Sequence, residues 1–150
     1  MIQRIQSVYL IAIIALEGLL NAFSFFEFKT AENHYALYSY AVKSISGDTQ
    51  AQEYKLLFAS ILGIVLAIIA LLSFKNRGRQ IKLTRGLLLL SITQISAIIF
   101  SIMGLGGADA TLVNLGLSSF LLPVIAILCV LSTKAIRKDD QLVKSVDRIR

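Results

Sequence analysis

The 150-residue chain is 56% hydrophobic and only 16% charged, with a mean hydropathy of +0.74. A soluble domain of this length could not bury so much apolar surface, so the composition excludes an ordinary soluble fold and predicts an integral membrane protein. The net charge of +6 is concentrated in a few short segments. This pattern indicates contact with anionic lipid headgroups and not with nucleic acid, which would need basic and aromatic residues interleaved on one face.

The first apolar segment, about residues 5–26, is long enough to cross some 30 Å of hydrocarbon as a helix. A cleaved signal peptide would have a shorter apolar core and a small-residue cleavage site, so we predict a retained first span. Arg4 and the amino terminus put positive charge before it, which favours the cytoplasm for this end.

Residues 27–53 form the first outer loop. Phe26, Phe28 and Thr30 alternate with polar residues, and residues 35–42 are rich in strand formers, which predicts a short two-stranded β-ribbon with a turn at 31–34. Aromatic residues gather in and around this loop, as in an interfacial aromatic belt. A platform for a cofactor or a sugar is the alternative interpretation.

Two further apolar segments, about residues 54–74 and 83–105, lie on either side of a basic hairpin. Moving several cations across hydrocarbon is costly, so the hairpin is predicted to stay in the cytoplasm. It holds five of the chain's 15 Lys and Arg residues, namely Lys75, Arg77, Arg79, Lys82 and Arg85.

A fourth span is predicted over about residues 112–133, after a short glycine-containing outer turn. The tail, 134–150, then becomes polar and includes the cations Arg137 and Lys138. Its apolar residues fall on one helical stripe, which predicts an amphipathic helix on the inner leaflet or, as the alternative, one docked on a protein partner. The stripe consists of Leu142, Val143, Val146 and Ile149.

The distribution of cations sets the predicted threading. Twelve Lys and Arg residues lie in predicted inner segments and three in outer ones, which favours four spans with both termini in the cytoplasm. The predicted fold is therefore an all-α membrane protein, a single domain over residues 1–150. It comprises a four-transmembrane-helix bundle, the β-ribbon in the first extracytoplasmic loop and the C-terminal amphipathic cytoplasmic helix.

Glu17 lies near the middle of the first span, where an ionised carboxylate is costly. Asn21 is one helical turn away and Gln94 lies at similar depth on the third span, so we expect an intramembrane polar cluster of these three residues. A neutral, hydrogen-bonded structural role, coupling to an ion or proton, and contact with a polar group of another subunit are the alternatives.

Catalytic and metal-binding constellations are not predicted. His34 is the sole histidine and lies in a loop, and Cys129 is the sole cysteine and lies in an apolar run. A closed zinc site needs more ligands, and an activated nucleophile needs an adjacent base. We therefore expect neither an enzyme nor a cofactor.

The two ends of the chain, Met1-Ile-Gln-Arg-Ile-Gln6 and residues 135–150, resemble those of the domain of unknown function 4293 family. The resemblance covers the whole chain in layout and implies a small four-helix inner-membrane protein of Bacteroidota without an assigned activity. It implies no functional residues.

The expected function is that of a noncatalytic inner-membrane accessory or scaffold subunit, because a bundle with little polar lining is joined to a patterned cytoplasmic tail. The expected partners are membrane lipids, including anionic headgroups, and a larger membrane-protein complex or further copies of the chain. A small proton-linked transporter or channel using Glu17 and Gln94 is the alternative.

Overall fold

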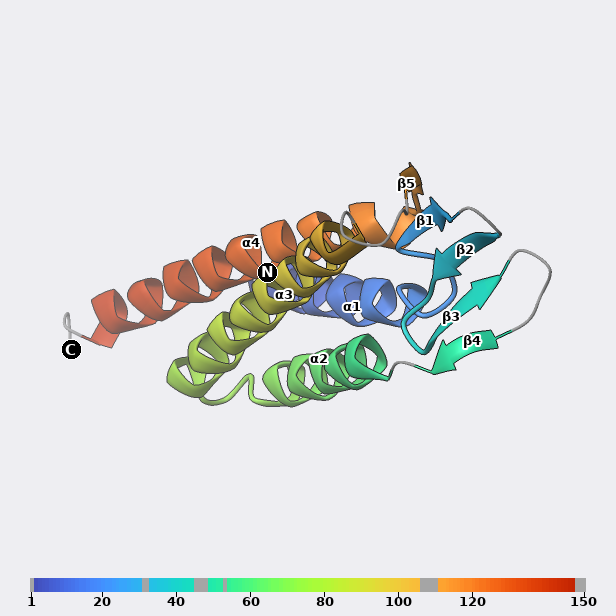
Figure 1. Cartoon of the computed structure of the whole chain (residues 1–150). Coiled ribbons are helices and arrows are strands. Elements are labelled where there is room, and N and C mark those ends of the chain that lie inside the picture. Colours follow the sequence, from blue (N-terminus) through green and yellow to red (C-terminus); the bar gives the residue numbers. More distant parts are fainter. Residues whose placement is uncertain (1, 31–32, 45–48, 53, 106–110, 148–150) are drawn as a thin grey trace.

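Four helices pack side by side and a small sheet lies at one end of them (Figure 1). The computed structural model describes residues 2–30, 33–44, 49–52, 54–105 and 111–147. The helices are α1 (Ile2–Leu19), α2 (Lys55–Leu72), α3 (Arg77–Leu105) and α4 (Leu117–Asp147). The strands are β1 (Phe26–Lys29), β2 (His34–Leu37), β3 (Ala41–Ser44), β4 (Thr49–Gln52) and β5 (Thr111–Leu115).

The outside of the helices is apolar. Phe58 on α2 and Phe100 on α3 are 68% and 78% exposed, an arrangement that suits hydrocarbon rather than water. By length and composition, α2, α3 and α4 could each cross a membrane, whereas the apolar part of α1 is the shorter stretch Ile5–Leu19. The protein is therefore mostly helical, with three candidate membrane-spanning helices among the described residues.

Each helix packs on two others in a closed ring, with α1 against α2 and α4, and α3 against the same two. The core contains Leu10 and Ile13 of α1, Leu87 of α3 and Ile125 of α4. On α2 the buried face is made of small residues, Ser60, Gly63, Ala67 and Ala70. Small side chains at this spacing let the helix backbones approach closely.

The sheet is larger than the predicted two-stranded ribbon. Its five strands are antiparallel in the order β4-β3-β2-β1-β5. The predicted pairing of residues near 26–30 with those after the turn is present as β1–β2, in which Phe26 faces Leu37. The connection between α3 and α4 supplies β5, which pairs with the free edge of β1. An edge strand leaves backbone groups unpaired, and β5 satisfies them.

Two helix boundaries at the sheet end differ from the prediction. α1 ends at Leu19 instead of near residue 26, because the chain turns so that Phe25 N can donate to the Leu37 carbonyl. The fourth helix begins at Leu117 instead of residue 112, because residues 111–115 are taken by β5. Apolar content alone does not distinguish a strand from the first turn of a spanning helix.

The helix boundaries at the end remote from the sheet also differ from the prediction. α3 begins at Arg77 instead of residue 83, and Asn76 Oδ1 caps it by accepting a hydrogen bond from Arg79 N. The predicted tail helix is not a separate element but continues α4 as far as Asp147, as Figure 1 shows. No glycine or proline occurs between residues 124 and 147, so nothing breaks the helix there.

Candidate functional site

Glu17 is the central residue of the candidate site. Together with Leu10, Ile13 and Leu20 it lies on the buried face of α1, and its side chain is only 1% exposed. These positions recur every three or four residues, so the helical period itself turns the carboxyl toward the other three helices.

Gln94 of α3 reaches the Glu17 side chain. The two side chains are hydrogen-bonded, and Gln94 is 3% exposed. Because Gln94 Oε1 lacks a hydrogen-bond partner among the described residues, the Gln94 amide nitrogen is the donor. Glu17 Oε2 is likewise without a partner among the residues that the structure describes. The pair therefore leaves two buried acceptor atoms unused.

α2 approaches the carboxyl through a glycine. A Cβ atom at Gly63 would lie 2.7 Å from Glu17 Oε1, well inside van der Waals contact. One turn earlier on α2, Ser60 Oγ donates to Asn21 Oδ1 at 3.1 Å, while Asn21 Nδ2 donates to the Glu17 carbonyl oxygen at 3.2 Å. Glu17, Asn21 and Gln94 thus lie together, and Ser60 and Gly63 belong to the same cluster.

The fourth helix closes the core with apolar and weakly polar groups. Cys129 is fully buried in the same hydrophobic core. Within the described residues, no group of three or more His, Cys, Asp or Glu is placed to hold a metal ion. The cluster is therefore a hydrogen-bonded acid in an apolar bundle, able to hold a proton or to satisfy a polar group from elsewhere.

A second polar region lies at the end remote from the sheet, where α1, α3 and α4 are tied together. Arg77 Nε of α3 contacts Asp139 Oδ2 of α4 at 2.8 Å, and Gln6 Nε2 of α1 donates to the Ala135 carbonyl at 3.1 Å. Both interactions are partly buried, so they fix the direction in which α4 leaves the bundle.

The predicted basic surface at this end divides into four groups. Arg77 is paired, whereas Arg85 and Arg137 line one small cavity together with Lys134. Arg4 lies in the first turn of α1. The others are exposed on the outside of the hairpin and the tail, namely Lys75, Arg79, Lys82 and Lys138.

The predicted tail stripe is only partly described. Leu142 and Val143 are 44% and 39% exposed on α4. Val146 lies in the last turn of that helix, and Ile149 lies outside the described residues.

The aromatic residues between positions 26 and 40 contact one another on and beside the sheet. Phe28 and Tyr35 stack with ring centroids 5.3 Å apart, and Lys43 Nζ donates to the Tyr40 hydroxyl at 3.0 Å. This hydrogen bond raises the pKa of Lys43 above its ordinary value. His34 is exposed at the start of β2. The rings therefore contact one another and Lys43.

Comparison with known proteins gives one result for the whole chain. Residues 2–149 match the model of a family described as a domain of unknown function, DUF4293. No curated protein matches the chain.

Proposed function

The chain belongs to the DUF4293 family of unknown function, and from this premise we propose that it is a noncatalytic accessory or scaffold subunit of a larger membrane assembly. It would reside in the bacterial inner membrane with four spans and both termini in the cytoplasm. The positive-inside distribution of cations supports this threading.

The observation that carries the scaffold role is the length of α4. Its 31 residues correspond to about 46 Å of helix, whereas hydrocarbon is about 30 Å thick. The surplus extends past the other helices at the end remote from the sheet (Figure 1). Since the Arg77–Asp139 ion pair fixes its base, the projecting helix has a defined direction.

The projecting part exposes apolar residues, Leu142 and Val143, among charged ones. An apolar stripe on a helix that stands clear of its own bundle suits docking into a groove of a partner protein.

Photo-crosslinking in living cells tests the scaffold role. A photoreactive amino acid at position 142 should yield a discrete protein adduct, and Val143→Ser should reduce that adduct several-fold by removing an apolar contact. The matched control places the same amino acid at position 141, an exposed position that lies about 100° around the helix from Leu142 and about 200° from Val143, where the adduct should be weak. Adducts at 142 to lipid alone would refute the docking role.

A second candidate function, proton-linked transport through Glu17, is favoured by one observation. Glu17 Oε2 is buried in the centre of the bundle and lacks a hydrogen-bond partner among the described residues, so a proton could bind there. Intramembrane acids of this kind commonly mark proton paths.

Flux measurement in liposomes separates the two candidates. A transporter predicts a proton-linked flux that Glu17→Gln abolishes while the fold is retained, because the amide is of similar size and cannot carry the proton. Absence of flux from the unmodified protein would remove this candidate and leave the scaffold role unaffected.

A further inference from the structure

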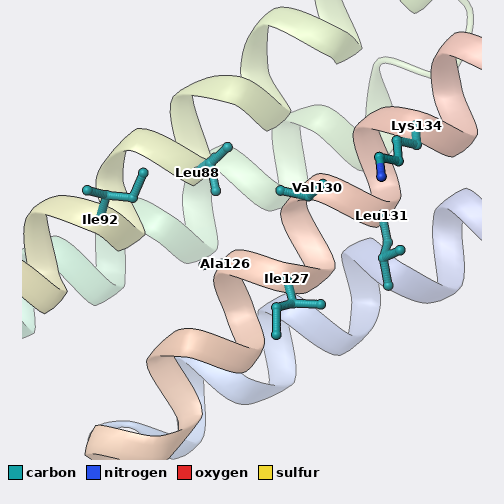
Figure 2. A pocket seen from close by; sticks show the side chains of 7 residues that line it. All are labelled: Leu88, Ile92, Ala126, Ile127, Val130, Leu131 and Lys134. Carbon is teal, nitrogen blue, oxygen red and sulfur yellow. The ribbon is translucent and has the colours of Figure 1, made fainter.

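An apolar groove of about 410 Å³ runs along the outside of the bundle between α3 and α4. Figure 2 shows its side chains on the two facing helices, with Lys134 at one end of the row. The apolar lining consists of Leu88 and Ile92 on α3 and Ala126, Ile127, Val130 and Leu131 on α4.

A smaller cavity of about 220 Å³ continues the groove toward the remote end of the bundle. The two hollows share Leu88, Val130 and Lys134, and the smaller one adds Arg85 and Arg137. None of the residues that line either hollow is acidic. An apolar channel therefore ends at three converging cations that no carboxylate neutralises within the lining.

The three cations lie where the apolar parts of both helices stop. On α3 the sequence is continuously uncharged from residue 86 to the end of the helix, and on α4 from its start to residue 133. In a membrane, Arg and Lys at such a boundary extend their charged ends to the headgroup layer while their stems stay in the apolar region. The groove then faces the acyl chains and the basic cavity faces the phosphates.

We propose that this composite site binds one anionic phospholipid, with an acyl chain along the groove and the phosphate held by Arg85, Lys134 and Arg137. Arginine forks match phosphate oxygens in bidentate geometry, and basic pockets between membrane helices are suited to anionic headgroups. The size of the larger hollow falls in the range of ligand sites, about 300–1,000 Å³. The inference requires the membrane placement but not the scaffold role.

Tryptophan quenching tests the proposal, since the chain has no tryptophan of its own. Ile127→Trp places a fluorophore in the groove, and Leu89→Trp places one on α3 at a residue that is 65% exposed and does not line the groove. Each variant is reconstituted in bilayers that contain phosphatidylglycerol and phosphatidylcholine, with brominated acyl chains on one lipid at a time. If the site binds the anionic lipid, brominated phosphatidylglycerol should quench the tryptophan at position 127 more strongly than its mole fraction in the bilayer would give. Quenching of the tryptophan at position 89 should follow the bulk lipid composition.

The charge requirement is tested in the Ile127→Trp background. Arg85→Gln, Lys134→Gln and Arg137→Gln should lower the preference for the anionic lipid roughly fivefold for each cation removed. The control substitutions remove the same number of exposed charges outside the cavity, namely Arg79→Gln, Lys82→Gln and Lys138→Gln. They should leave the preference for the anionic lipid unchanged. Filling the groove with Ala126→Phe should abolish the preference while every cation is retained.

Three outcomes would overturn the proposal. Equal quenching of position 127 by both lipids would mean an ordinary lipid-facing surface. Protection of position 127 from both lipids, while position 89 is quenched, would mean that a second copy or another protein covers the groove. Absence of quenching at position 89 as well would refute the membrane placement itself.

Discussion

Gly63 is the residue at which the polar cluster is most tightly constrained. A Cβ atom there would lie 2.7 Å from Glu17 Oε1 and 2.9 Å from Glu17 Cδ, and the buried carboxyl has little room to withdraw. We expect Gly63→Ala to lower the free energy of unfolding by about 1–3 kcal/mol, the usual range for overpacking. Thermal unfolding in mild detergent measures the loss.

The matched control for this substitution is Gly86→Ala, because a Cβ at that helical position meets nothing within 4 Å. It should change stability by no more than about 1 kcal/mol, in the stabilising direction, from helix propensity alone. In a Glu17→Ala background the cost of Gly63→Ala should vanish. If the two substitutions are instead additive, the contact between α2 and the carboxyl is not the cause.

Helical periodicity predicted the juxtaposition of Glu17, Asn21 and Gln94, because polar side chains at equal depth in a bundle turn toward one another. It did not predict Ser60 and Gly63 as members of the cluster. Whether Ser60 and Gly63 face the cluster depends on how α2 is rotated about its axis, and the packing of α2 against α1 and α3 decides that rotation. The recurrence of small residues along α2 was the available signal, and it is equally compatible with contact between copies.

At the scale of elements, the junction between β5 and α4 depends on Gly116. A Cβ there would lie 2.1 Å from the Ser24 carbonyl oxygen, which is backbone and cannot rotate away. Gly116 N donates to the Phe25 carbonyl, and Ser118 Oγ donates to the carbonyls of Leu20 and Phe23. The end of α1 and the start of α4 are therefore held together at this point.

We expect Gly116→Ala to destabilise the protein by about 3 kcal/mol, near the upper end for a forced steric shift. Limited proteolysis should show faster cleavage near β5, and thermal unfolding should move to lower temperature. Gly78→Ala is the control, since a Cβ there meets only Asn76 Oδ1 at an ordinary 3.7 Å. Equal effects of the two substitutions would show that the junction tolerates displacement.

Local sequence patterns predicted the helices and the β1–β2 pair but not the full sheet. Three of the five residues at 111–115 are apolar and the segment adjoins an apolar helix, so its composition favours a span as much as a strand. What decides the outcome is the free edge of β1, about 80 residues earlier in the chain. Such non-local pairing cannot be inferred from a window of neighbouring residues, since it depends on α1 and α4 bringing the two loops together.

At the scale of the whole molecule, α1 and α4 run antiparallel through the bundle. Ser118 Oγ bonds to the Leu20 carbonyl near the sheet, and Gln6 Nε2 bonds to the Ala135 carbonyl at the opposite end. From Gln6 to Leu20, just after the end of α1, is 14 residues, or about 21 Å of helix. The matching stretch of α4, from Ala135 back to Ser118, takes 17 residues. If α4 crosses a membrane, α1 therefore crosses it at nearly the same depths, although its own apolar stretch is short.

This pairing predicts an even number of crossings, with the sheet on one side and both termini on the other. In a Cys129→Ala background, single cysteines are placed at Asn33, Asn76 and Gln141, all exposed positions. A membrane-impermeant maleimide added to cells with a permeabilised outer envelope should label position 33, because the sheet end carries few cations. Positions 76 and 141 should react only after the inner membrane is opened, as should a cysteine in a peptide fused before Met1.

Labelling of the fused cysteine together with position 33, while 76 and 141 stay protected, would mean that α1 does not cross. In that event the hydrogen bond between Gln6 and Ala135 could not exist in the membrane.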